Sequence, residues 1–148
     1  MTTKIAMTTI MTTTLKPCTS PWCSVRLPQN VIPIHYNLRI KANVNELSFN
    51  GTQSMFVRVT NATKYVLFHF KQMNITEFKI YKMDGYSKQS VAIAGGQSKP
   101  TNEYFVIETT NQMQPGNYEV EVQFQALVSK KLTGFYRSTY KNQNGQTR

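Results

Sequence analysis

Residues 117–128, NYEVEVQFQALV, show the most regular alternation in the sequence. Glu or Gln alternates there with apolar side chains, which are Tyr118, Val120, Val122, Phe124 and Ala126. A period of two is typical of a β-strand with one buried face and one wet face. We therefore predict a strand whose outward carboxylates, Glu119 and Glu121, are solubilising charges.

The same alternation recurs along most of the chain. It predicts strands over residues 35–42, 47–59, 64–70, 75–83 and 103–109. Asn50-Gly51 would also permit a hairpin turn, but the alternation passes through the pair unbroken, so we prefer one long strand there. Turns are expected at MDGYSK, AGGQSKP and MQPGN, and no segment has a sustained helical period. About eight short strands without crossover helices predict an all-β domain, an antiparallel sandwich or curved sheet.

The first 24 residues differ in composition from the remainder. They are rich in Thr and Met and repeat MTT three times, which predicts a disordered spacer before a single domain over residues 25–148. A Thr-rich O-glycosylated stalk is an equally open interpretation. We expect neither a signal peptide nor a transmembrane segment here, because no apolar run is long enough.

The net charge of +10 raises the question of nucleic-acid binding. The Lys and Arg residues come one or two at a time between strand-like runs, without a basic block or a phosphate-binding Gly loop. Scattered cations are typical of a solvated surface. We expect no nucleic-acid partner.

Metal-binding and catalytic patterns are missing from the sequence. Cys18 and Cys23 are the only cysteines, and the two histidines, His35 and His69, lie in separate strand patterns. A zinc site needs more ligands than these provide, and there is no H-E-x-x-H, G-x-S-x-G or P-loop. We predict no catalytic, metal or substrate-binding residue in this chain; Cys18 and Cys23 could form a local disulfide or remain two thiols.

Three N-x-S/T sequons begin at Asn50, Asn61 and Asn74. Three sequons are close to the number expected by chance, but their positions suit glycosylation. Asn50 is on the wet face of its strand, Asn61 is in a turn, and Asn74 begins a strand. We predict all three as N-glycosylation candidates.

The sequence ends in what resembles an unfinished hairpin. GFYRSTY, residues 134–140, predicts a strand, and NQNG predicts a tight reversal. Without a returning partner the strand at residues 135–140 would be an open edge. We therefore expect self-association, including a homodimer through this C-terminal edge.

Several motifs carry a family resemblance: RLPQNVIPIHYNLRI, VTNAT before YVLFHF, NYEVEVQFQA, and L-x-GFYRSTY followed by G-x-T-R. Over residues 26–148 the chain resembles the N-terminal β-domain of the aminopeptidase N family of zinc aminopeptidases. The similarity is greatest to the branch of the endoplasmic-reticulum and leucyl-cystinyl aminopeptidases.

The resemblance implies a saddle-shaped, mostly antiparallel β-domain that packs on a thermolysin-like catalytic domain and walls the substrate cavity. It also implies a zinc enzyme that removes N-terminal residues from peptides, as a single-pass type II protein on the lumenal or extracellular side of a membrane, or as a secreted one. The family's zinc ligands, catalytic Glu and G-A-M-E-N segment match no residues in this sequence.

We hypothesise that the chain is a fragment, a truncated gene model or a shortened isoform of such an enzyme. The opposing hypothesis is a standalone β-sandwich binding module, either a peptide binder or a decoy partner of a full-length aminopeptidase. The nucleotide sequence after the Arg148 codon would discriminate between them.

Overall fold

The described residues, 20–129 and 135–146 of a computed structural model, form β-strands and a single short 3-10 helix. Every strand pairing is antiparallel, so the predicted all-β class is confirmed. In chain order the elements are β1 Val31–Asn43, β2 Ser48–Val59, β3 Thr63–His69, β4 Asn74–Asp84, β5 Ser87–Ser90, β6 Ile93–Lys99, η1 Pro100–Asn102, β7 Tyr104–Met113 and β8 Gly116–Leu127.

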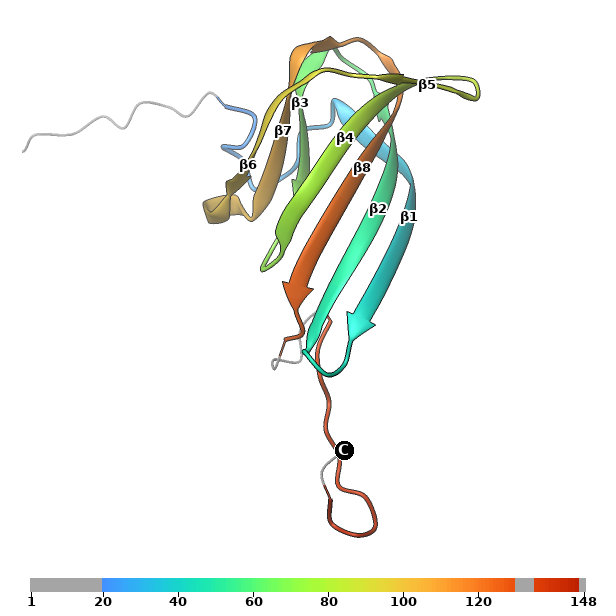
Figure 1. The fold of residues 1–148 in the computed structure, drawn as a ribbon. Helices are drawn as coiled ribbons and strands as arrows, with labels where there is room; N and C mark the ends of the chain where they lie inside the picture. The colour runs from blue at the N-terminus through green and yellow to red at the C-terminus, as the bar shows by residue number, and fades with distance from the viewer. Residues whose placement is uncertain (1–19, 130–134, 147–148) are drawn as a thin grey trace, which may run out of the picture.

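The strands form two sheets (Figure 1). Sheet A has the order β1-β2-β8-β4-β5, and sheet B has the order β3-β7-β6. One face of sheet A, here called the inner face, packs on sheet B through a shared apolar core, and the opposite face is called the outer face. The buried members of that core are Met55, Val57, Val59, Val66, Ile80, Phe105, Ile107, Met113, Tyr118, Val120 and Val122.

Gly96 of β6 allows the two sheets to approach closely. A Cβ atom at this position would lie 2.5 Å from Cζ of Phe78 and 3.0 Å from Cζ of Phe105. Because the glycine has no side chain, the Phe78 ring of sheet A can reach sheet B, where it stacks edge-on against Phe105 at 5.5 Å between centroids. The Phe78 ring therefore fills the space that a side chain at Gly96 would occupy.

Most strands lie where the alternation predicts them. The strand through Asn50-Gly51 is continuous in β2, and the turn at MDGYSK lies between β4 and β5. The prediction of a turn over AGGQSKP was wrong, because Ile93–Lys99 pairs with β7 as β6. Two adjacent glycines have low strand propensity, and pairing with β7 overrides it.

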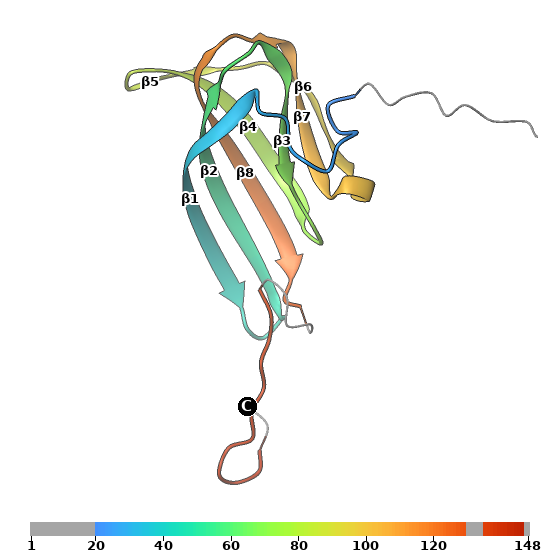
Figure 2. The ribbon, with the colours of Figure 1, turned by 180° about the vertical axis from the view of Figure 1, so that it is seen from behind.

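Sheet A extends beyond sheet B. Figures 1 and 2 show the lower ends of β1, β2 and β8 continuing past the end of the three-stranded sheet. β1 lies at the edge of sheet A, and every residue in it except Val31 is exposed. The prediction that one face of this strand is buried was therefore wrong for most of its length.

The described C-terminal residues do not form the predicted strand. In residues 135–140 the only ladder contact is a bridge between Tyr136 and Ser129. The reversal is present, because Gly145 donates its N–H to the carbonyl of Asn142 and Asn142 donates to Gln146. An isolated hairpin is marginally stable without a further strand or a covering layer, which explains why residues 137–140 are not in a ladder. Sheet A instead has an open edge at β1, the first strand in its order.

The described end of the N-terminal segment contacts sheet B. Trp22 stacks edge-on against Tyr65 at 5.5 Å, and Nζ of Lys99 lies 4.7 Å from the Trp22 ring. The buried Tyr104 hydroxyl donates to the Ser24 carbonyl at 2.8 Å. The predicted spacer falls mainly on residues 1–19, outside the described residues, and its boundary near residue 24 remains a prediction.

Candidate interaction surface

The inner face of β1 is apolar and uncovered. Tyr36 lies opposite the buried Met55, so the two side chains share a face, and Leu38 and Ile40 follow on that same face. Tyr36, Leu38 and Ile40 are 51%, 57% and 41% exposed. A row of large apolar side chains left in water is typical of a surface that another layer covers.

An aromatic cluster closes the lower end of this inner face. The Phe49 ring lies 6.3 Å from the Phe124 ring and 5.0 Å from the Phe135 ring, both edge-on. A Cβ at Gly51 would lie 2.4 Å from Cζ of Phe124, so the ring occupies the space over this glycine. Phe135, which the sequence placed in a strand, instead anchors the C-terminal residues to the end of sheet A. Nothing local in the sequence marks it for that position.

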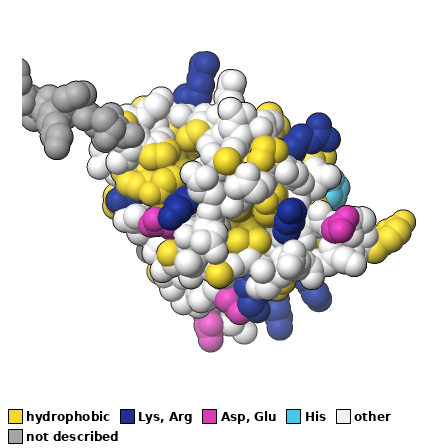
Figure 3. All heavy atoms as spheres, turned by 90° about the horizontal axis from the view of Figure 1, so that it is seen from above, with side chains coloured by type: hydrophobic (Ala, Val, Ile, Leu, Met, Phe, Trp, Pro, Cys, Tyr) yellow, Lys and Arg dark blue, Asp and Glu magenta, His cyan; other side chains and the backbone are white. Residues whose placement is uncertain are grey.

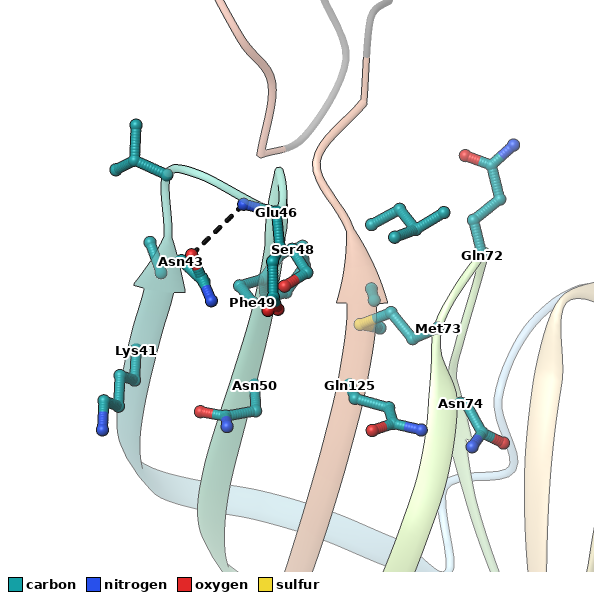
Figure 4. A pocket seen from close by; sticks show the side chains of 14 residues that line it. Lys41, Asn43, Glu46, Ser48, Phe49, Asn50, Gln72, Met73, Asn74 and Gln125 are labelled. Carbon is teal, nitrogen blue, oxygen red and sulfur yellow. Dashed lines mark hydrogen bonds between the residues drawn. The ribbon is translucent and has the colours of Figure 1, made fainter.

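The outer face of the same half is polar. Lys41 pairs with Asn50, and Gln125 lies between Asn50 and Asn74 in the ladders of β2, β8 and β4. Figure 4 shows these four side chains as a row across the strands. They line part of a hollow of about 810 Å³ at the end of the sheet, where Glu46 donates its backbone N–H to Oδ1 of Asn43 at 3.2 Å.

All three sequon asparagines have exposed side chains. Asn50 and Asn74 are on the outer face with one strand between them, and Asn61 lies in the connection between β2 and β3. A glycan at any of the three would not enter the core. Glycosylation at these positions remains a prediction.

The outer face also holds an ion pair between a buried carboxylate, Glu119, and an exposed cation, Lys88. Glu119 is only 3% exposed, and its Oε2 atom lies 2.6 Å from Nζ of Lys88. Lys88 also lies 3.3 Å from Glu121 and sits over the Tyr81 ring. The prediction of Glu119 as a solubilising charge on a wet face was therefore wrong.

The charge partner of Glu119 comes from β5. The Glu119 carboxylate beside Nζ of Lys88 raises the pKa of Lys88 above its ordinary value of 10.5, against the opposing effect of burial. Burial likewise raises the pKa of Tyr118 above its ordinary value, although the hydroxyl donates to the Gln114 carbonyl. The sequence could not predict the Lys88 contact, because Lys88 belongs to β5, which is distant from β8 in sequence and is separated from it in sheet A by β4.

The cations do not gather on the face shown in Figure 3. Lys and Arg side chains there are spread between apolar patches and carboxylates. Some are paired with acids, as Lys79 is with Glu77 at 2.7 Å. The absence of a nucleic-acid partner remains a prediction.

No group of three potential metal ligands comes together among the described residues. His35, in sheet A, interacts with Asn37 through Nε2 and Oδ1 at 2.9 Å. The His69 ring lies 4.8 Å from the ring of Tyr104, its register partner in sheet B. The potential metal-ligating side chains in this part of the chain therefore do not suit a zinc ion.

Cys18 lies outside the described residues, and its disulfide with Cys23 remains a prediction. Within the same part of the chain, no helix is long and apolar enough to cross a membrane.

Comparison with known proteins agrees with the resemblance found in the sequence motifs. Human endoplasmic reticulum aminopeptidase 2 is 33% identical over 131 residues, covering 86% of this chain and 14% of that protein. Human glutamyl aminopeptidase is 30% identical over 131 residues, covering 86% and 13%. Human endoplasmic reticulum aminopeptidase 1 is 29% identical over 131 residues, covering 86% and 14%.

The chain thus spans about one-seventh of the length of the curated relatives it matches. Residues 32–148 match the family model described as the peptidase M1 N-terminal domain, and the chain belongs to that family.

Proposed function

We propose that this chain is the non-catalytic N-terminal domain of a zinc aminopeptidase that removes N-terminal amino acids from peptides. The observation that carries the proposal is the family match over residues 32–148. The parent enzyme's zinc and catalytic residues belong to a separate catalytic domain, and peptides are its substrates.

The domain packs on that catalytic domain through the uncovered inner face of sheet A and walls the substrate cavity. Exposed Tyr36, Leu38 and Ile40 on this face support the assignment, since apolar surface of this kind gains stability when a second layer excludes water. The polar outer face with Asn50 and Asn74 faces solvent, which is the side that glycans require.

The parent acts on the lumenal or extracellular side of a membrane, or after secretion. Two of the relatives carry the endoplasmic reticulum in their names, and the exposed sequons suit that setting. Expression in a secreting eukaryotic cell behind an added signal peptide tests this. We expect a mass ladder that an N-glycosidase collapses, whereas an unshifted band would remove this support for the lumenal setting.

The transcript beyond the Arg148 codon tests the proposal directly. A frame that continues into G-A-M-E-N and H-E-x-x-H segments is expected. An in-frame stop in a well-supported transcript would favour a standalone binding module, for which the same apolar face would be the binding surface. The purified chain should bind no stoichiometric zinc and release no amino acid from aminoacyl-naphthylamides.

The packing face has its own test in the parent enzyme. Leu38→Glu should lower its thermal midpoint and its peptidase activity, because a carboxylate would be buried in the interdomain contact. Asn37→Glu, one residue away on the outer face, is the matched control and should change neither. Equal effects of the two variants would contradict the assignment of the inner face.

A further inference from the structure

β1 presents a free edge as well as a free face. It ends sheet A on one side, so its outward backbone N–H and C=O groups have no strand partner among the described residues. Pro33 and the bulge that follows it interrupt the register near the start of the strand. Residues 35–43 remain as a regular edge to which an extended segment could pair.

The two faces of this edge differ in chemistry. Tyr36, Leu38 and Ile40 project on the inner face, whereas Arg39 and Lys41 project on the outer face. No residue of β1 is acidic. A strand added beside β1 would therefore need apolar side chains on one face and would gain from carboxylates on the other.

Sheet A already contains a strand of this kind. β8 alternates buried Val120 and Val122 with Glu119 and Glu121, and β4 and β5 supply the matching cations. Lys79 is the register partner of Glu121, and Lys88 forms ion pairs with both carboxylates. The apolar and basic pattern of β1 is complementary to a second strand with the pattern of β8.

From this edge we infer a β-addition site on residues 35–43 for an extended segment of a partner polypeptide that alternates acidic and apolar residues. The segment extends sheet A, places its apolar side chains beside Tyr36, Leu38 and Ile40 on the inner face, and places carboxylates beside Arg39 and Lys41 on the outer face. A second copy of this chain fits less well. Pairing β1 with itself would bring these cations close to their own equivalents, and edge cations oppose such pairing in natural sheets.

The site is tested on the full 148-residue chain, independently of any catalytic domain. A labelled peptide of about nine residues that alternates Glu and Val is long enough to pair with the edge. Fluorescence anisotropy measures its affinity, and hydrogen exchange followed by mass spectrometry measures protection of the amides in residues 35–43. We expect binding with protection there, no binding of the Lys-Val counterpart, and loss of binding when proline replaces the central Val.

Reversing the charges of Arg39 and Lys41 is the most discriminating test of the site. Arg39→Glu/Lys41→Glu should weaken binding of the Glu-Val peptide by roughly tenfold or more, while the Lys-Val peptide gains affinity. Arg58→Glu/Lys64→Glu makes the same change in net charge away from the edge and should preserve the preference for Glu-Val. Circular dichroism checks that both variants fold.

Three outcomes would overturn the inference. Equal binding of the proline-containing peptide would mean attraction to positive charge without strand pairing. Equal loss in both double variants would mean dependence on net charge alone. Protection of residues 35–43 without peptide, with a mass in light scattering that rises with concentration, would assign the edge to a second copy.

Discussion

The two halves of sheet A have similar alternation and different surroundings. In the half beneath sheet B, Val57 and Ile80 are each 1% exposed, whereas in the projecting half Leu38 is 57% exposed. The alternation identifies which side chains share a face, but it does not say whether a second layer covers that face. Each prediction below compares a covered or partly covered position with an exposed one.

Truncation in the covered core should have the largest effect. Ile107 of β7 is fully buried between the sheets, so Ile107→Ala should lower the free energy of unfolding by about 2–5 kcal/mol through lost burial and a cavity. Urea unfolding followed by circular dichroism measures the change. A loss below about 1 kcal/mol would mean that the two sheets are not packed as described.

The next largest loss of stability is expected when the buried carboxylate of Glu119 loses its cation. Lys88→Met keeps an apolar stem but leaves the 3% exposed Glu119 without its cation, which should cost about 1–3 kcal/mol. Lys79→Met is the matched control, because it removes a cation from an exposed pair with Glu77 and should have little measurable effect. Similar losses in both variants would contradict the importance of burial at Glu119.

The same contact predicts a pH dependence at high pH. The folded pKa of Lys88 is raised above 10.5, so its stabilising contribution is complete below that pH and is lost as pH rises through the raised value. The stability difference between the original chain and Lys88→Met should therefore be constant near neutrality and shrink above pH 10.5. A difference that disappears already at neutral pH would rule out the ion pair as its cause.

A smaller effect is expected at the end of the sheet. Phe135 is 45% exposed and meets Phe49 edge-on, so Phe135→Ala should cost roughly 1 kcal/mol. It should also speed amide exchange at Arg137, whose N–H is bonded to the Ser129 carbonyl. Tyr140→Ala, at a more exposed aromatic of the same C-terminal residues, serves as the control and should leave that amide unchanged.

The smallest effect is expected on the uncovered face. Leu38→Ala removes an apolar side chain that contacts mainly water, so the stability of the isolated chain should change by less than about 0.5 kcal/mol. Chemical denaturation of the monomeric chain provides the measurement, with light scattering to establish the monomer. A loss as large as that of Ile107→Ala would mean that Leu38 is already covered, and would remove the distinction between the two halves.

Most of the strands could be predicted because the alternation of apolar and polar residues is a property of each strand alone. It does not depend on which other strands pair with it. It gave the continuous β2 and the faces of β8. It missed β6, where Gly95 and Gly96 leave no apolar pattern and pairing with β7 supplies the structure. It also mistook Phe135 for a strand residue, because an aromatic side chain suits a strand and an anchor equally.

The sites depend still more on distant contacts. Exposure of the sequon asparagines could be predicted, since Asn50 and Asn74 lie at polar positions of strand patterns and Asn61 lies in a turn. Burial of Glu119 could not, because it results from Lys88 on a strand far away in sequence. The apolar row of β1 was found in the sequence, but its exposure follows from the length of sheet B relative to sheet A.

The position of β8 has a mechanical consequence. β8 is paired along its length with β2 on one side and β4 on the other, and it leads toward the C-terminal residues that Phe135 anchors. A pulling force applied to those residues would first separate the Phe135–Phe49 contact. It would then load both ladders of β8 in shear, so that many hydrogen bonds resist together instead of opening one by one. The domain would therefore transmit tension from its C-terminal side into the middle of sheet A, while the free edge at β1 carries little of the load.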